Sequence, residues 1–149
     1  DGLREKITFV VTLSDADFQQ HFPVECRDCV VNTGPVKPDE GPSLYNECDA
    51  LFLPTLLECF SASYPEAMAM EKPILTTDLG FARSICGDAA LYFTPCNAED
   101  AIEKARDLIV DQELRRKLVD AGSKQLARFD TPQERAEKYL AICEGLISD

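Results

Sequence analysis

Two glutamates, Glu58 and Glu66, follow an apolar segment that is expected to form a β-strand, and their positions suit the binding of a polar ligand. The segment 51–54 is apolar, Glu58 falls in the loop after it, and Glu66 lies in the first turn of a helix expected to begin at Ser63 or Tyr64. Loops that leave the carboxyl ends of parallel strands are where open α/β sheets bind ligands. Because an ionised carboxylate offers two acceptor oxygens, Glu66 suits a pair of hydroxyls such as those of a ribose.

The expected helix start offers a second kind of binding group. Its unpaired N–H groups and positive dipole end stabilise a nearby negative charge by about 0.3–1 kcal/mol, which suits a diphosphate. A plainer interpretation stays open, because Ser63-Tyr64-Pro65-Glu66 also fits the capping box S-x-x-E, and spacing alone favours that cap. The plain interpretation of Glu58 is a solvated surface residue, although loops also carry functional residues. With 27 acidic residues among 149, chance gives roughly five acidic pairs eight apart, so only the context of this pair is informative.

Composition predicts one domain over residues 1–149 and limits its partners. A chain of 149 residues, 45% of them hydrophobic, can bury one ordinary core. Its formal charge of −12 disfavours nucleic acid and anionic lipid. No apolar run approaches the roughly 20 residues of a transmembrane helix, and no leader segment is evident, so we expect no transmembrane segment and a cytoplasmic location.

The seven cysteines are odd in number and scattered, which fits a reducing compartment. Cys26-Arg27-Asp28-Cys29 alone has the spacing of a metal or redox site. A structural zinc ion would need a second matching pair, and the sole histidine, His21, does not supply one. No metal ion is therefore expected.

Apolar strands alternate with helices along the first two-thirds of the chain, which predicts an α/β fold with a doubly wound, Rossmann-like parallel sheet. Residues 97–149 are expected to be mainly helical, because their apolar positions follow a 3.6-residue period. Thr131-Pro132-Gln133-Glu134 has the pattern of a capping box that begins the last helix. Strands are expected at 7–13, 29–34, 50–54, 73–77 and 90–93, and shorter helices at 14–22, 42–48, 63–70 and 81–86.

The stretch from about residue 41 to residue 100 resembles the C-terminal, donor-binding domain of GT-B glycosyltransferases of family 4, the group 1 glycosyl transferases. That family carries a strand, a Glu-x7-Glu motif, a helix and a further strand in this order. The residues that carry the resemblance are Leu51-Phe52-Leu53-Pro54, Glu58, Glu66, Ala67-Met68-Ala69, Lys72-Pro73-Ile74-Leu75-Thr76-Thr77 and Gly87-Asp88-Ala89-Ala90-Leu91-Tyr92-Phe93-Thr94-Pro95.

The resemblance implies roles for the residues of the motif. Glu66 would hold the ribose of a nucleotide diphosphate sugar, and Glu58 would act in catalysis beside the sugar, by bonding its hydroxyls or supporting charge at the anomeric centre. Phe60 matches the family's aromatic position. Ser61 stands where glycine is usual, so a positive φ there would be strained. The phosphates would be received by backbone N–H groups around Ser61, Ala62, Ser63 and Tyr64.

The resemblance also implies an activity, which is the retaining transfer of a sugar from a nucleotide diphosphate sugar to a glycan or other acceptor, as in polysaccharide biosynthesis, without a metal or other cofactor. The family's further first strand, its Gly-Arg…Lys-Gly segment and its N-terminal acceptor domain have no counterpart in this sequence. We therefore expect the chain alone to bind a donor weakly and to transfer nothing. Without that strand, we expect the strand at 7–13 to pair directly with the strand at 51–53, or the exposed sheet edge to form a homo-oligomer.

Three alternatives remain at this stage. The chain could be a noncatalytic α/β docking module or a fragment of a nucleotide-sugar epimerase, whose glutamate pattern fits less well. A receiver-type signalling domain is the third alternative, and it would need a strand-end lysine that is not evident in this sequence.

Arg83 could offer a positive group to the ligand, although a surface arginine on a helix is the plainer interpretation.

Overall fold

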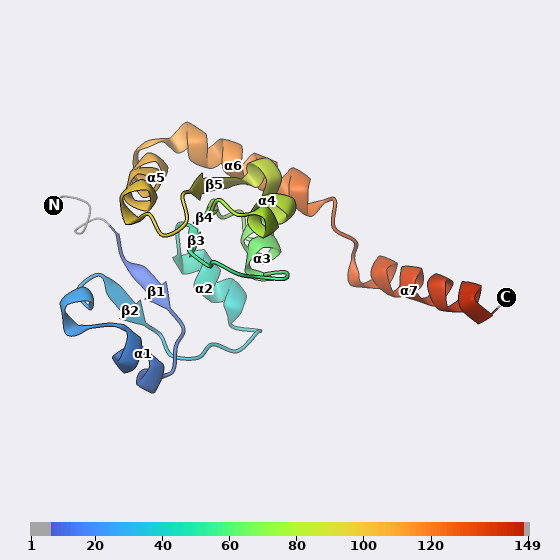
Figure 1. The fold of residues 1–149 in the computed structure, drawn as a ribbon, viewed down its shortest axis with the longest axis horizontal. Coiled ribbons are helices and arrows are strands. Elements are labelled where there is room, and N and C mark those ends of the chain that lie inside the picture. Colours follow the sequence, from blue (N-terminus) through green and yellow to red (C-terminus); the bar gives the residue numbers. More distant parts are fainter. Residues whose placement is uncertain (1–6, 148–149) are drawn as a thin grey trace.

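The computed structural model describes residues 7–147 and confirms an α/β fold in which strands and helices alternate (Figure 1). Short 3-10 turns lie at Val24–Cys26 and Gly87–Ala89. The strands are β1 (Phe9–Val11), β2 (Val30–Asn32), β3 (Leu51–Leu53), β4 (Ile74–Thr77) and β5 (Ala90–Phe93), and the helices are α1 (Asp15–His21), α2 (Gly41–Glu47), α3 (Ser63–Ala69), α4 (Gly80–Cys86), α5 (Ala98–Val110), α6 (Gln112–Leu126) and α7 (Pro132–Ile147).

All strand pairs are parallel within residues 7–147, as the alternation predicted, but they form two sheets. The first sheet has the order β1-β2, and Phe9 is opposite Val30. The second has the order β3-β4-β5, and Leu51 is opposite Ile74. Because every residue of the central strand β4 is buried, the second sheet forms the centre of the fold.

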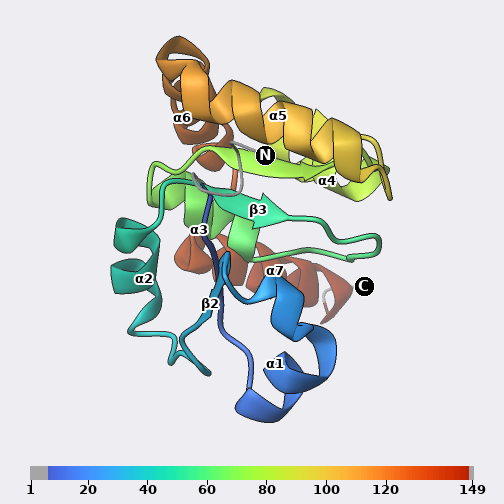
Figure 2. The ribbon, with the colours of Figure 1, turned by 90° about the vertical axis from the view of Figure 1, so that its left-hand side faces the viewer.

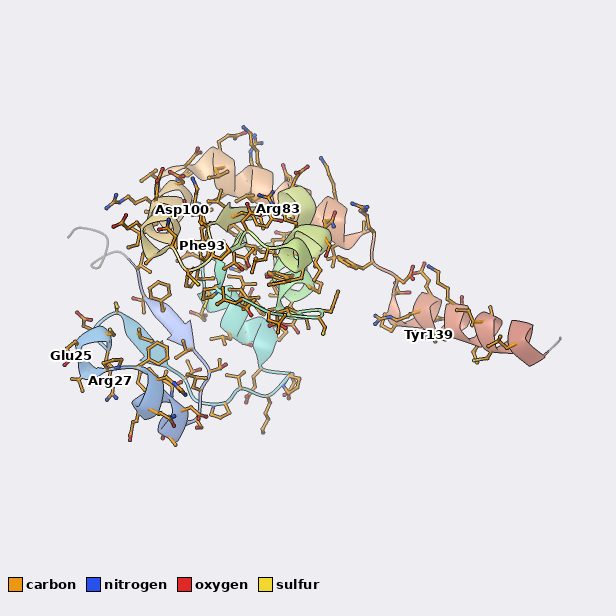
Figure 3. The ribbon with its side chains drawn as sticks, viewed as in Figure 1. Glu25, Arg27, Arg83, Phe93, Asp100 and Tyr139 are labelled. Atoms are coloured by element: carbon orange, nitrogen blue, oxygen red, sulfur yellow. The ribbon has the colours of Figure 1, made fainter. Side chains whose placement is uncertain are left out.

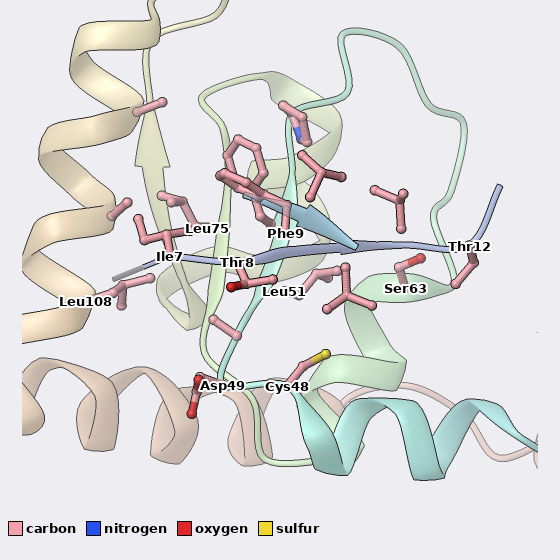
Figure 4. Close-up of a pocket in the computed structure, with 18 of the residues that line it drawn as sticks. Ile7, Thr8, Phe9, Thr12, Cys48, Asp49, Leu51, Ser63, Leu75 and Leu108 are labelled. Atoms are coloured by element: carbon pink, nitrogen blue, oxygen red, sulfur yellow. The ribbon is translucent and has the colours of Figure 1, made fainter. Parts of the chain in front are cut away.

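The prediction that the strand at 7–13 pairs directly with the strand at 51–53 is wrong. Within the described chain, β1 pairs only with β2, and β3 pairs only with β4. Paired strands must run alongside one another about 4.8 Å apart, whereas β1 runs across β3 (Figures 2 and 4). Side chains rather than backbones meet at this crossing, where the ring centroids of Phe9 and Phe52 are 5.4 Å apart.

The second sheet has a separate apolar cluster on each face, because successive side chains of a strand point to opposite sides. Ile74 points to the face covered by α3, α4 and η2, the turn at Gly87–Ala89, where Tyr64, Met68 and Cys86 are buried. Leu75 points to the other face, whose buried cluster is completed by Phe93, Leu108 and Leu118. Both faces of the sheet are therefore covered, which holds the loop after β3 on a rigid base.

The last helix, α7, extends away from the rest of the fold (Figure 1). Its predicted capping box is confirmed, because the N–H of Thr131 donates to Glu134 Oε2 at 2.8 Å and the N–H of Glu134 donates to Thr131 Oγ1 at 3.2 Å. The side chain of Tyr139 is exposed and points away from the helix axis (Figure 3). None of the helices within residues 7–147 is both long enough and apolar enough to cross a membrane.

Candidate functional site

Two threonines on β4 fix the start of the loop that carries Glu58. Thr76 Oγ1 donates to the carbonyl oxygen of Leu53 at 2.8 Å, and Thr77 Oγ1 donates to the carbonyl oxygen of Thr55 at 2.6 Å. Thr76 Oγ1 also lies 2.8 Å from the hydroxyl of Tyr64. Because the one hydroxyl hydrogen of Thr76 goes to Leu53, the Tyr64 hydroxyl is the donor in that pair. These buried bonds tie the end of β3 and the start of α3 to β4.

The predicted residues of the loop have different surroundings. Glu58 is partly buried, and Phe60 is 56% exposed with its ring edge-on to Phe129 at a centroid distance of 6.2 Å. Ser61 is buried. Its φ is not positive, because the non-glycine residues with positive φ in the described chain are Glu71 and Cys96. Serine at this position is therefore not strained by its backbone conformation.

The backbone at the start of α3 has free donors. Within residues 7–147, the N–H groups of Ser61, Ala62 and Ser63 donate to no protein acceptor, whereas that of Tyr64 donates to the carbonyl oxygen of Ser61 at 3.4 Å. Such unpaired donors at the first turn of a helix can receive the oxygens of an anion. The predicted phosphate-binding N–H groups are thus available, apart from the partly engaged N–H of Tyr64.

The capping box that spacing alone favoured does not form. The N-cap residue of α3 is Ala62, with helical backbone angles, and no side chain caps this helix. Ser63 is therefore already inside the helix, where its hydroxyl does not reach the N–H of Glu66 as a cap would. Glu66 is exposed, so its carboxylate is left available for another role.

Glu66 is instead bonded by Tyr45 of α2, a residue that the sequence did not single out. The Tyr45 hydroxyl donates to Glu66 Oε2 at 3.3 Å and lies 3.4 Å from the carbonyl oxygen of Ser63. Burial, with the negative charge of Glu66 as the next cause, raises the pKa of Tyr45 to about 12, so the hydroxyl keeps its proton at neutral pH. The structure thus brings together Tyr45, Ser63 and Glu66.

These three residues lie at the side of a cleft of about 2620 Å³ between the two sheets. The cleft is lined by Phe9 and Thr12 of the β1 segment, by Leu51 of β3 and by Ser63 of α3 (Figure 4). Glu66 of α3 also lines it. Glu58, Phe60, Ser61, Ala62 and Tyr64 are not among the residues that line it. Of the predicted site residues, only Ser63 and Glu66 therefore line this cleft, and Glu58 lies outside it.

Arg83, labelled on α4 in Figure 3, is already bonded to another side chain. Its Nε and Nη2 donate to the two carboxylate oxygens of Asp78 at 2.7 and 2.8 Å. Its guanidinium lies 3.9 Å from the ring centroid of Tyr92. This geometry supports the plainer interpretation of Arg83 as a surface residue of α4.

The Cys26-x-x-Cys29 segment forms no metal cluster in the part of the chain that the structure describes, where no three His, Cys, Asp or Glu side chains are placed to hold an ion. The thiol of Cys29 donates to the carbonyl oxygen of Cys26 at 3.2 Å, which is a local turn contact.

The parallel second sheet is covered on both faces, and a carboxylate and N–H groups lie at the helix that follows one strand end. This is the architecture of a Rossmann-like domain. Residues 24–125 match the family model of the group 1 glycosyl transferases. The chain belongs to this family.

Two curated relatives support the assignment. The chain is 28% identical over 120 residues to a sulfoquinovosyl transferase of Arabidopsis thaliana, and the aligned part covers 74% of this chain and 24% of the relative. It is 32% identical over 93 residues to an uncharacterized glycosyltransferase of Methanocaldococcus jannaschii, which covers 61% of this chain and 26% of the relative. The chain thus spans about a quarter of the length of these relatives.

Solved structures of GT-B glycosyltransferases share the fold. A glycosyltransferase from Rickettsia africae matches 99% of this chain and 42% of its own, with a TM-score of 0.79 and 18% identity. The sucrose-phosphate synthase of Thermosynechococcus elongatus matches 93% of this chain over 38% of its own length, with a TM-score of 0.76 and 16% identity. HepE of Anabaena, solved in complex with UDP, matches 100% of this chain over 44% of its own length, with a TM-score of 0.72 and 22% identity. These likenesses establish the Rossmann-like fold of the GT-B C-terminal half.

Proposed function

We propose that this chain is the donor-binding part of a retaining family 4 glycosyltransferase, which moves a sugar from a nucleotide diphosphate sugar to a glycan or other acceptor. The observation that carries the proposal is the carboxylate of Glu66, which is free of helix capping, bonded by Tyr45 and placed at the cleft. Membership of the glycosyl transferase family and the UDP bound to HepE of Anabaena support a nucleotide diphosphate as the ligand.

In this proposal, Glu66 accepts hydrogen bonds from the ribose hydroxyls, which an exposed carboxylate with one open oxygen can do. The free N–H groups of Ser61, Ala62 and Ser63, joined by that of Tyr64, receive the diphosphate. Phe60 is exposed beside them and lies near the donor. No metal ion is assigned a part.

Glu58 is proposed as the catalytic residue beside the sugar. During transfer, the bond between the anomeric carbon and the diphosphate oxygen breaks and a bond from the anomeric carbon to the acceptor oxygen forms. The proton of the acceptor hydroxyl passes to the departing diphosphate oxygen, and the nucleoside diphosphate leaves. Positive charge develops on the sugar in the transition state, and a fixed carboxylate stabilises such charge best where water is excluded. Glu58 lies on the loop that β4 holds through Thr77 and Thr55, which places it on a fixed support.

The acceptor side of the reaction is proposed to come from an N-terminal acceptor domain of the same enzyme, because the chain spans only 24–26% of its curated relatives. On this proposal the isolated chain binds a donor weakly and does not transfer sugar. The edges of β1 and β3 that pair with no other strand in the described structure can pair with a strand of a second copy, which sedimentation of the purified chain tests.

The test is isothermal titration calorimetry of the chain with UDP and GDP. We expect binding of at least one nucleotide, and loss of that binding in Glu66→Ala. Glu103→Ala is the matched control, since Glu103 is an exposed glutamate of α5 that does not itself line the cleft and its replacement makes the same change in charge. Binding that survives in Glu66→Ala contradicts the proposal. Absence of any nucleotide binding favours the noncatalytic docking module, which the exposed apolar side chains of α7 also suit.

A further inference from the structure

We propose that Tyr45 is a positioning residue that holds the Glu66 carboxylate in place for the two ribose hydroxyls, and so sets the preference of the site for ribose. This inference rests on the proposed function of Glu66 as the ribose acceptor.

The hydroxyl of Tyr45 lies between two acceptors on α3, at 3.3 Å from Glu66 Oε2 and 3.4 Å from the carbonyl oxygen of Ser63. A hydroxyl carries a single hydrogen, which both acceptors share in this arrangement. Tyr45 thereby contacts the backbone of the first helical turn as well as the side chain that projects from it. The carboxylate is fixed relative to the backbone N–H groups of the same turn.

The support behind this hydroxyl is rigid. The ring of Tyr45 packs against the core cluster that contains Tyr64, Met68 and Ile74. Because its pKa is raised to about 12, chiefly by burial, the hydroxyl remains a donor throughout the neutral pH range. An exposed glutamate otherwise samples several rotamers and loses that freedom when it binds. Because Tyr45 is held by the core, its hydrogen bond restricts the Glu66 side chain before the ligand binds. Less side-chain entropy is then lost on binding.

The bond also determines which oxygen is left for the ligand. Tyr45 engages Oε2, whereas Oε1 accepts no hydrogen bond within residues 7–147. Each carboxylate oxygen has two lone pairs, so Oε1 and the remaining lone pair of Oε2 can receive two neighbouring hydroxyls. A ligand without those hydroxyls gains nothing from a correctly placed carboxylate, so the contribution of Tyr45 should appear as selectivity.

The experiment compares the binding of UDP and 2′,3′-dideoxy-UDP to the chain, to Tyr45→Phe, to Glu66→Ala and to the double variant. We expect the unmodified chain to prefer UDP, and Tyr45→Phe to lower that preference roughly 3- to 10-fold, as expected for the loss of one ordinary hydrogen bond, because this bond is long, at 3.3 Å, and exposed. In the Glu66→Ala background, Tyr45→Phe should change nothing further, because Tyr45 acts through Glu66. A tyrosine that only stabilised the fold would weaken both nucleotides equally.

Tyr92→Phe is the matched control. It also removes one tyrosine hydroxyl, whose bond is to the carbonyl oxygen of Gly87 at 2.7 Å, and it should leave the preference unchanged. Thermal melting of every variant confirms that it is folded, and Tyr45→Phe keeps the ring that packs on the core. Full UDP preference in Tyr45→Phe, together with its loss in Glu66→Ala, overturns this inference and leaves the proposed function standing. Absence of preference in the unmodified chain instead contradicts the ribose role of Glu66 itself.

Discussion

Tyr45 and Glu66, 21 residues apart in the sequence, are joined by a hydrogen bond of 3.3 Å between the tyrosine hydroxyl and one carboxylate oxygen. The bond links α2 to α3 across the start of the helix, where the N–H groups of Ala62 and Ser63 have no acceptor among the described residues. An acceptor for hydroxyls and donors for an anion therefore lie within one helical turn. This combination is what a nucleotide diphosphate requires.

Replacement of Thr76 by valine should destabilise the domain. The substitution keeps the shape but removes the hydroxyl that donates to Leu53 and accepts from Tyr64. Because the Tyr64 hydroxyl is then left buried without its partner, we expect a loss of about 1–3 kcal/mol in the free energy of unfolding. Urea denaturation followed by circular dichroism measures it. Thr8→Val, at an exposed threonine, is the control and should change stability little. A Thr76→Val variant as stable as this control would show that the buried chain of hydroxyls does not hold the loop.

Cys86 should resist alkylation in the folded protein. Its side chain is fully buried, and burial raises the pKa of the thiol to about 12, so almost no reactive thiolate forms at pH 8. Brief iodoacetamide treatment followed by mass spectrometry should label the exposed Cys26, Cys59 and Cys96 well before Cys86. In denaturant, Cys86 should be labelled as fast as the other cysteines. Early labelling of Cys86 in the native protein would mean that the cluster between α3 and α4 opens readily.

The ion pair between Asp78 and Arg83 should make a small contribution to stability that depends on pH. The hydrogen bonds from Arg83 hold the pKa of Asp78 below its ordinary value of 3.8. A carboxyl with a lowered pKa stabilises the fold above the unfolded value, and this contribution is lost as the pH falls through the folded value. The melting temperature of Asp78→Asn should therefore lie below that of the unmodified chain at pH 7, and the two should converge below about pH 4.

Because both side chains of that pair are about half exposed, the difference should be small and should decrease with added salt. Asp39→Asn, at an exposed loop aspartate, is the matched control. A difference between the chain and Asp78→Asn that stays constant from pH 7 to pH 3 would contradict the pairing.

The local elements could be predicted from the sequence, because their signals lie within a few residues. Ser14 caps α1 by accepting from the N–H of Asp17, and Thr131 and Glu134 form the capping box of α7. The capping box predicted for Ser63 and Glu66 does not form, although these residues fit the same S/T-x-x-E pattern as Thr131 and Glu134. Ala62 already has helical backbone angles, so α3 begins one residue too early for Ser63 to cap it.

The tertiary relationships could not be predicted from such signals. Where β1 crosses β3, the rings of Phe9 and Phe52 are in contact, and these residues are far apart in the sequence. Tyr45 carries no local pattern that connects it with Glu66, and only the packing of α2 beside α3 reveals the bond. The spacing of Glu58 and Glu66 likewise does not show that only Glu66 lines the cleft.

The most direct test of the central claim, that α3 and its preceding loop bind a nucleotide diphosphate, is a two-dimensional NMR titration of the isotopically labelled chain with UDP and GDP. One of these nucleotides should shift the amide signals of Ser61, Ala62, Ser63 and Glu66 in a saturable manner, and the amides of α7, whose residues do not line the cleft, should stay in place. Saturable shifts confined to other elements, or no shift with either nucleotide at millimolar concentration, would contradict it.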